Sequence, residues 1–196
     1  MSEERHQQRQ QRLKEKVDAR IAGAREERGI VIVFTGNGKG KTTAGFGTVT
    51  RAVGHGMRAG VIQFIKGQWP NGERNLLEAH GVEFQVMATG FTWNTQNRVT
   101  GRAAAREVWQ HGLRMLADET LDVVLLEKLT YMVTCDYIDL SEVIEALQRR
   151  PPNQTVIITG RACHRELLDL ADTVSELRPV KHAFDAGIKA QQGIDW

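Results

Sequence analysis

Cysteine is scarce in this sequence, which contains two residues of this type, Cys135 and Cys163, among 196. They form no close-spaced pair, so they cannot build a disulfide framework or a Cys-x-x-Cys zinc site. We expect both to be buried packing residues. The six histidines are scattered and show no helical ligand spacing, so the sequence predicts no histidine-based metal cluster.

Long apolar runs are also lacking. No stretch approaches the roughly eighteen consecutive apolar residues that read as a membrane-spanning helix. Nothing at the start of the sequence resembles a basic segment followed by the apolar core of a secretory signal. We therefore expect a cytoplasmic protein with no membrane partner.

Basic and acidic residues are nearly balanced in number. The 26 basic and 24 acidic residues leave a formal net charge of +2, which indicates neither a nucleic acid nor an anionic membrane as a partner. With 196 residues, 41% of them hydrophobic, the chain is long enough for one compact domain with a substantial core.

The most informative segment is a glycine-rich loop at residues 35–43, which reads Thr-Gly-Asn-Gly-Lys-Gly-Lys-Thr-Thr and follows the apolar run 30–34. In such a loop the backbone N–H groups turn toward phosphate oxygens, Lys41 adds a positive charge, and the Thr42 hydroxyl can bind Mg²⁺. The sequence thus predicts a nucleoside triphosphate site, although the strict motif has glycine at the position of Thr35. A flexible surface loop is the alternative, but the strand and helix character of the flanks disfavours it. The predicted phosphate-binding residues are Gly36, Asn37, Gly38, Lys39, Gly40, Lys41, Thr42 and Thr43.

Beyond residue 28 the sequence alternates between apolar runs typical of buried strands and segments with helical periodicity. Strands are predicted at 30–34, 60–65, 82–87, 122–126 and 155–159, with a weaker one at 173–177. Helices are predicted at 41–53, 101–117, 140–149 and 164–171, and the segment 66–81 is expected to be an irregular insertion. Because runs such as 123–126 are apolar on both faces, the strands should be parallel and covered by helices on both sides. The predicted fold class is α/β, a three-layer sandwich with a mostly parallel sheet of the P-loop NTPase (RecA-like) type.

Residues 1–28 are different in composition, rich in Gln, Arg, Lys and Glu with few large apolar side chains. We interpret them as an N-terminal arm preceding a domain at 29–196. Leu13, Val17 and Ile21 recur every four residues and would form a narrow apolar stripe on a helix. Such a stripe cannot hold a helix in place alone, so the arm either stays mobile or docks as a lid on another surface.

One carboxylate outside the loop completes the predicted site. Phosphate loops usually act with a carboxylate at the end of a buried strand, which holds Mg²⁺ opposite the loop threonine. Glu127 follows the apolar run 123–126 and fits this description, so Thr42 and Glu127 are the candidate metal ligands. The next residue, Lys128, cannot accept a proton from an attacking water, which disfavours efficient ATP hydrolysis.

With these segments in view, the sequence resembles the ATP:corrinoid adenosyltransferases of the cobalamin-salvage type over nearly its whole length. The segments that carry the resemblance are 36–43, 64–67, 69–75, 90–93, 129–131, 159–161 and the tail 176–189.

The resemblance implies that the loop binds ATP and that the Co(I) centre of a reduced cobalamin or cobinamide attacks the ribose C5′, expelling triphosphate. Lys41 and the loop would stabilise the charge of this leaving group. Phe91 and Trp93 are the candidate apolar residues near the cobalt, where they would exclude water, and ordinary core aromatics are the alternative. The resemblance also implies a homodimer, a reduced flavoprotein as electron donor, and an N-terminal segment that can close over the corrinoid.

The sequence departs from this family at the metal site, because relatives carry Asp-Glu where this chain has Glu127 and Lys128. Exchanging a carboxylate for an ammonium group near an ion changes the electrostatic interaction energy with that ion by on the order of several kcal/mol, at an effective dielectric constant of about 20. Three outcomes stay open: Glu127 acts as the ligand, Lys128 pairs with the γ-phosphate instead of the metal, or the site is weakened. A smaller departure is Ala162, where relatives tend to have glycine.

Two other functions remain as alternatives. A kinase or ATPase would use the same loop and release ADP, with Arg51, Arg98 or Arg161 as a candidate arginine finger. A non-catalytic ATP- or corrinoid-binding protein is the other, and the altered metal site favours it.

Overall fold

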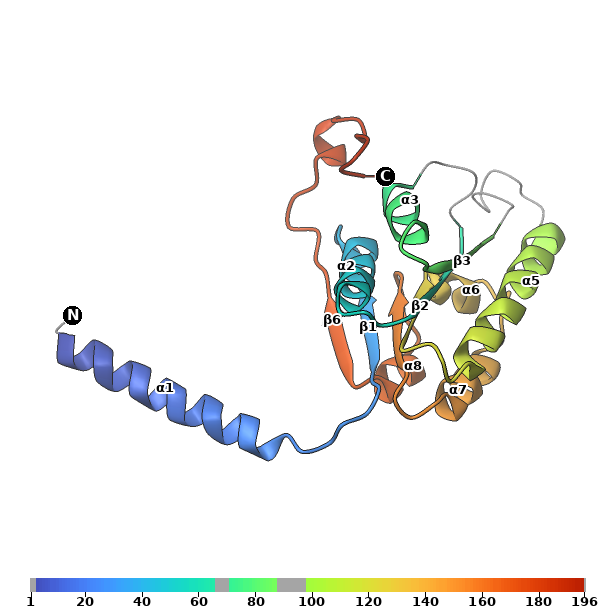
Figure 1. The fold of residues 1–196 in the computed structure, drawn as a ribbon. Coiled ribbons are helices and arrows are strands. Elements are labelled where there is room, and N and C mark those ends of the chain that lie inside the picture. Colours follow the sequence, from blue (N-terminus) through green and yellow to red (C-terminus); the bar gives the residue numbers. More distant parts are fainter. Residues whose placement is uncertain (1–2, 66–70, 88–97, 196) are drawn as a thin grey trace.

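The protein is built around one six-stranded parallel β-sheet (Figure 1). The computed structural model describes residues 3–65, 71–87 and 98–195. The strands are β1 (Val31–Thr35), β2 (Ala59–Gln63), β3 (Glu83–Val86), β4 (Val123–Glu127), β5 (Thr155–Thr159) and β6 (Thr173–Glu176). They lie in the order β3-β2-β4-β5-β1-β6, and all neighbouring pairs are parallel. The predicted α/β class with its parallel sheet is confirmed.

Helices connect these strands. Those of the described segments are α1 (Glu3–Gly23), α2 (Lys41–Gly54), α3 (Gly72–Glu78), α5 (Arg98–Ala117), α6 (Leu129–Thr134), α7 (Leu140–Arg149), α8 (Arg165–Leu170) and the 3₁₀ turn η1 (Phe184–Ala186). The predicted ends of two helices agree with this, since α2 stops at Gly54 and α7 stops before the two prolines at 151 and 152.

The core lies in two layers, one on each face of the sheet. Successive side chains of a strand point to opposite faces, and the central strand β4 is buried along its full length. Leu125 belongs to the same buried cluster as Phe46 of α2, whereas Leu126 belongs to a second cluster with Trp109 of α5. Figure 1 shows α2 and α5 on opposite sides of the sheet. Burial on both faces is why the central strands read as continuous apolar runs.

The strand order brings the predicted site residues to one edge of the sheet. β1, which precedes the glycine-rich loop, is separated from β4 by β5. Glu127 ends β4 and is aligned in register with Gln63, the last residue of β2. Because the carboxyl ends of parallel strands share an edge, the loop and Glu127 meet there.

The segment 66–81 is not irregular throughout, so that prediction was wrong for part of it. Residues 72–78 form α3, and Asn71 begins this helix by accepting the backbone N–H groups of Glu73 (3.2 Å) and Arg74 (3.4 Å) through Oδ1. Asn71 is buried, and its Nδ2 donates to Gln63 Oε1 at 3.1 Å. A capping asparagine tied to a strand end therefore fixes a helix too short to show periodicity.

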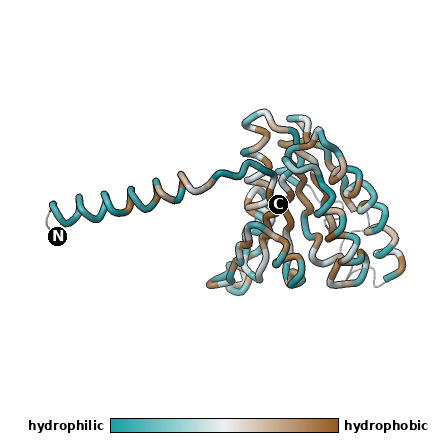
Figure 2. The backbone as a smooth tube through the Cα atoms, turned by 90° about the horizontal axis from the view of Figure 1, so that it is seen from below, coloured by the Kyte–Doolittle hydropathy of each residue, from teal (hydrophilic) through white to brown (hydrophobic). Residues whose placement is uncertain are grey.

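The N-terminal arm is a helix that packs on nothing among the described residues. α1 has no buried residue, and Leu13, Val17 and Ile21 are 55%, 44% and 66% exposed. Figures 1 and 2 show α1 extending away from the sheet as a mostly hydrophilic rod. The apolar stripe is present, and its docking as a lid stays a prediction.

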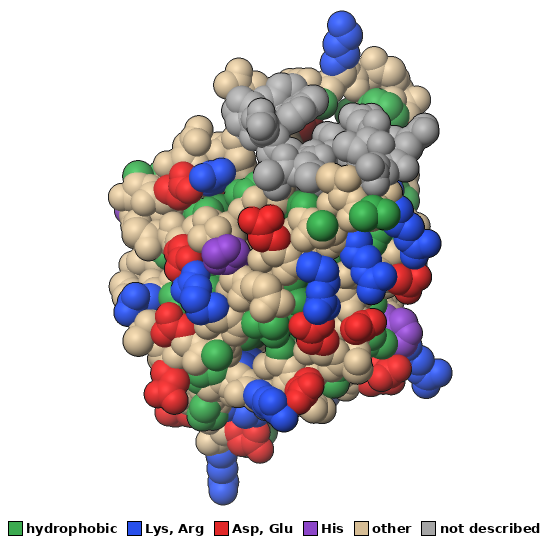
Figure 3. Space-filling model, turned by 90° about the vertical axis from the view of Figure 1, so that its right-hand side faces the viewer, with side chains coloured by type: hydrophobic (Ala, Val, Ile, Leu, Met, Phe, Trp, Pro, Cys, Tyr) green, Lys and Arg blue, Asp and Glu red, His purple; other side chains and the backbone are tan. Residues whose placement is uncertain are grey.

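Both cysteines pack against the core that contains α5, but each is only partly buried. Burial raises the pKa of the Cys163 thiol to about 11, so this thiol is a packing group at neutral pH. Among the described residues no helix is long and apolar enough to cross a membrane. Figure 3 shows acidic and basic side chains interspersed on the face that includes α5.

Candidate active site

The glycine-rich loop joins β1 to α2 in a conformation that only glycine suits at two positions. Gly40 has a φ of 115°, in the left-handed region where a side chain would be strained. Gly38 lies so close to the end of the sheet that a Cβ atom would come within 2.7 Å of the Arg178 carbonyl oxygen. Its N–H group donates to the Leu177 carbonyl oxygen at 2.7 Å. Thr35, where the strict motif has glycine, is the buried last residue of β1.

The helix that follows presents its N-terminus to the loop. α2 begins at Lys41, and no side chain caps it, since Gly40 occupies the N-cap position. The first backbone N–H groups of a helix have no acceptor within the helix, and its dipole places partial positive charge there. This arrangement suits an anion such as a phosphate.

Lys41 lies beside the same loop. Its Nζ donates to the Gly38 carbonyl oxygen at 2.5 Å. Burial lowers the pKa of Lys41, and the positive charge of Arg161 lowers it further. Both causes disfavour the charged ammonium group, so a bound anion would stabilise it.

Thr42 and Glu127, the two candidate metal ligands, are in contact. Thr42 Oγ1 donates to Glu127 Oε1 at 2.8 Å, and the Glu127 side chain is fully buried. Lys128 Nζ lies 3.5 Å from the same Oε1. The Lys128 side chain therefore contacts the carboxylate of Glu127 and also lines a cleft in front of the loop.

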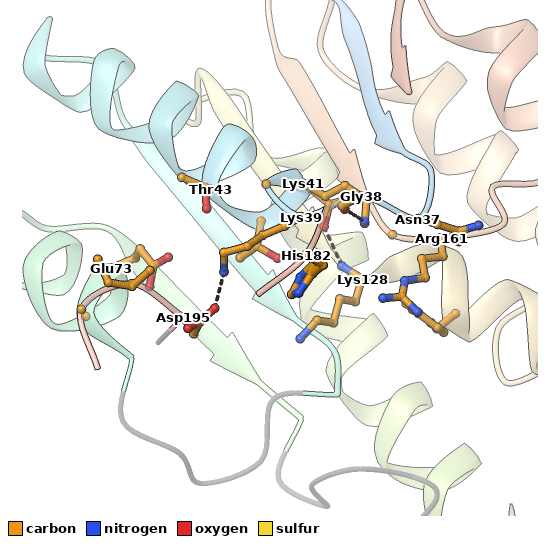
Figure 4. Close-up of a pocket in the computed structure, with 18 of the residues that line it drawn as sticks. Asn37, Gly38, Lys39, Lys41, Thr43, Glu73, Lys128, Arg161, His182 and Asp195 are labelled. Atoms are coloured by element: carbon orange, nitrogen blue, oxygen red, sulfur yellow. Dashed lines mark hydrogen bonds and ion pairs between the residues drawn. The ribbon is translucent and has the colours of Figure 1, made fainter. Parts of the chain in front are cut away.

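A cleft of about 580 Å³ lies over these groups. Its lining consists of residues 37–43, Gly72, Glu73 and Leu76 of α3, Lys128, Tyr131, residues 159–161, His182 and residues 193–195. Figure 4 shows Lys39, Lys41, Lys128 and Arg161 as cationic side chains around it. Lys39 forms an ion pair with Asp195 near the end of the chain. The cleft thus gathers positive charge and helix N–H groups in one place, which favours a polyanionic ligand.

The structure brings most of the predicted site residues together. All the predicted phosphate-binding residues line the cleft except Gly36, which lies against the Leu177 backbone. Glu127 is not part of the lining but contacts Thr42, which is. Phe91 and Trp93 are outside the described residues. Of the candidate arginine fingers, Arg161 lines the cleft, whereas Arg98 contacts Asp136 at 3.3 Å.

Several cleft residues were not predicted from the sequence. Glu73 depends on the placement of α3, and His182 and Asp195 belong to a tail that returns to the loop. The Leu177 and Arg178 backbones meet Gly36 and Gly38 across about 140 residues of sequence, and no local pattern signals a contact of this range.

The sequence also matches known protein families. Residues 27–196 match the family model described as "ATP:corrinoid adenosyltransferase BtuR/CobO/CobP", and residues 1–21 match "Cob(I)alamin adenosyltransferase N terminal". The chain is 76% identical to a corrinoid adenosyltransferase of Escherichia coli (strain K12) over 196 residues, which is 100% of both chains. It is 74% identical to the corrinoid adenosyltransferase CobA of Salmonella typhimurium over 100% of both. With a corrinoid adenosyltransferase of Pseudomonas aeruginosa the identity is 44%, over 99% of this chain and 97% of the relative.

Proposed function

The chain belongs to the ATP:corrinoid adenosyltransferase family, and we propose that residues 36–43 hold the triphosphate of ATP during the reaction of this family. The enzyme is a corrinoid adenosyltransferase, which transfers the 5′-deoxyadenosyl group of ATP to the cobalt of a reduced corrinoid. The electron pair of Co(I) forms the bond to C5′. The bond between C5′ and oxygen breaks, and its electron pair leaves with triphosphate.

The observation that supports this proposal is the uncapped start of α2 beside Lys41. As the bond to C5′ breaks, negative charge grows on the departing triphosphate. Donors already aimed at that position stabilise this charge without having to reorganise. Arg161, which lines the same cleft, adds a second cation. No proton must be removed from the nucleophile, so the reaction needs no general base.

Thr42 of the loop and the adjacent Glu127 suit a magnesium ion. Mg²⁺ is commonly bound by one or two protein oxygens together with substrate phosphates and waters. The Thr42 hydroxyl and the Glu127 carboxylate are oxygen ligands of this kind, and their oxygens lie 2.8 Å apart. We assign Mg²⁺ to these two residues; when bound, it would neutralise charge on the triphosphate. Lys128 Nζ, at 3.5 Å from Glu127 Oε1, competes with the ion for that carboxylate.

A Mg²⁺ titration of adenosylation tests this assignment. In Lys128→Glu the competing ammonium group is gone and a carboxylate replaces it, so half-maximal activity should need about tenfold less Mg²⁺ than in the wild type. Lys189→Glu reverses the charge of an exposed lysine outside the cleft lining and serves as the matched control. Equal Mg²⁺ dependence in the wild type and Lys128→Glu would refute a role for Lys128 at the metal.

The corrinoid side of the site rests on Phe91 and Trp93. We propose that these aromatic residues lie near the cobalt and exclude water from it. The N-terminal arm, residues 1–28, is proposed as a lid over the corrinoid on the domain 29–196. Its support is the exposed stripe of Leu13, Val17 and Ile21, which docking on another surface would bury.

The remaining proposals concern the setting of the enzyme. By resemblance to the family, we propose a homodimer and a reduced flavoprotein that supplies the electron for Co(I). We also propose a cytoplasmic location, with which the use of ATP as substrate is consistent. The family match favours this reaction over a kinase, an ATPase or a non-catalytic binding protein, and the release of inorganic triphosphate rather than ADP distinguishes them in an assay.

A further inference from the structure

His182 occupies an unusual place in the tail of the chain, residues 178–195. It is the one residue of this tail that is not exposed. Its side chain lines the cleft, and Figure 4 shows it in the same part of the cleft as Lys39 and Lys128. The His182 ring therefore borders the cleft, whereas the rest of the tail is exposed.

The tail is fixed to the phosphate loop at both of its ends. Directly before its start, the Leu177 carbonyl oxygen accepts the Gly38 N–H at 2.7 Å. Near the end, Asp195 pairs with Lys39, and its Oδ2 accepts the Gln191 N–H at 2.8 Å. His182 lies between these two attachments, so its position is set by the fold.

One hydrogen bond determines which ring nitrogen of His182 can donate. The Phe184 backbone N–H donates to His182 Nδ1 at 3.1 Å. A backbone N–H is only a donor, so Nδ1 must be the acceptor, and the neutral ring carries its proton on Nε2. The ring therefore offers an N–H donor on the side away from the Phe184 amide.

The surrounding charges indicate what this donor binds. Lys39, Lys41, Lys128 and Arg161 around the cleft are donors without acceptor atoms, and a ligand they attract is rich in acceptor oxygens. Glu73 and Asp195 are the acids of the lining, and Asp195 is paired with Lys39. We propose that His182 Nε2–H donates a hydrogen bond to the triphosphate of bound ATP. This inference rests on the triphosphate site proposed above and adds a ligand-binding residue from the tail.

Two substitutions separate the roles of the two ring nitrogens. In His182→Asn the side-chain oxygen can still accept the Phe184 N–H, but nothing reaches the position of Nε2. In His182→Gln the amide nitrogen reaches that position and restores a donor. His164 provides the matched control, because its Nδ1 accepts the Glu166 N–H at 3.3 Å in the same local arrangement outside the cleft lining.

The experiment is calorimetric titration of the full chain with inorganic tripolyphosphate. His182→Asn should weaken binding about tenfold, since a hydrogen bond to a charged acceptor contributes roughly that factor. His182→Gln should recover most of the loss, and His164→Asn should bind as the wild type does.

Three results would overturn the inference. One is unchanged tripolyphosphate affinity in His182→Asn, and another is a His182→Gln variant as weak as His182→Asn. The third is weaker binding of adenosine with tripolyphosphate affinity unchanged, which would place the ring against the nucleoside. If the wild type itself fails to bind tripolyphosphate, the proposed triphosphate site is wrong as well, and this outcome distinguishes the two failures.

Discussion

Two residues beside the cleft have backbone conformations that their side chains disfavour. Lys128 has a φ of 62° and Ala162 a φ of 48°, both in the left-handed region. Lys128 is held there by its N–H, which donates to Thr159 Oγ1 at 3.0 Å. Such strained residues cluster at functional sites because the surrounding structure enforces them. The left-handed conformation also means that glycine would suit position 162.

Replacing Ala162 by glycine should therefore stabilise the protein. Removing the Cβ relieves the strain of the left-handed conformation, and the greater freedom of glycine in the unfolded chain offsets part of the gain. We expect the free energy of unfolding to rise by about 0.5 kcal/mol, measured by urea denaturation. Ala79→Gly, at an exposed residue with a φ of −63°, is the control and should lower stability. Destabilisation by both substitutions would show that position 162 is not strained.

At the scale of single residues, the sequence pointed to the loop that lines the cleft but not to the tail residues that line it. Gly38, Gly40, Lys41 and Thr42 follow one another, so their chemistry is visible in order. Glu127 was recognisable because it ends an apolar run. His182 carries no such signal, because its role depends on a return of the chain to the loop.

Helix α3 shows how one buried side chain can position an element of the site. Asn71 accepts two N–H groups at the start of α3 and donates to Gln63 at the end of β2. Glu73 and Leu76 of this helix line the cleft. The wall of the cleft formed by α3 is therefore tied to the same sheet edge that carries Glu127.

Asn71→Ala should be strongly destabilising for this reason. It removes the N-cap and leaves the buried Gln63 Oε1 without its donor, a combined cost of about 2 to 3 kcal/mol. Chemical denaturation measures the loss. Asn71→Ser keeps a capping oxygen and removes only the contact to Gln63, so it should lose about half as much. Equal losses in the two variants would mean that the cap contributes nothing.

Continuous burial makes some strands easy to recognise in the sequence. β4 and β5 are apolar on both faces, so their runs were unmistakable. α3 and α6 have seven and six residues, less than the two turns over which an apolar stripe repeats. For residues 1–28 the sequence did not decide between a mobile arm and a docked lid, because a stripe of three apolar residues does not show what surface it contacts.

At the scale of the whole molecule, one ion pair ties the arm's end to the sheet. Arg28 Nη2 lies 2.6 Å from Asp172 Oδ1, and the Val31 N–H donates to Asp172 Oδ2 at 2.8 Å. Asp172 directly precedes β6, so this contact joins β1 to an edge strand. The hydrogen bond from Arg28, followed by that from Val31, lowers the pKa of Asp172 to about 2.

This pair predicts a pH dependence of stability. The native pKa of Asp172 lies below its unfolded value of about 3.9, so the ionised carboxylate stabilises the fold at higher pH. That contribution is lost as the pH falls from about 4 to about 2. Asp172→Asn should therefore lower the free energy of unfolding at pH 7 by about 1 kcal/mol, after allowance for solvent screening of a partly exposed pair.

Urea denaturation at several pH values checks this expectation. The difference between the wild type and Asp172→Asn should shrink as the pH is lowered from 4 toward 2. Asp169→Asn, in an exposed pair with Arg165 at 3.6 Å, is the control and should have little effect at any pH. A difference for Asp172→Asn that is constant with pH would contradict the assignment.

We infer that the loop amides and Lys41 bind the triphosphate so that it leaves readily from the adenosine carbon. The most direct test of this inference is Lys41→Ala, with ATP affinity measured by calorimetry and adenosylation under strong reduction, and with the exposed Lys189→Ala as control. We expect Lys41→Ala to lose about 100-fold in turnover and to bind ATP more weakly. Unchanged ATP affinity and unchanged turnover in Lys41→Ala would contradict this inference.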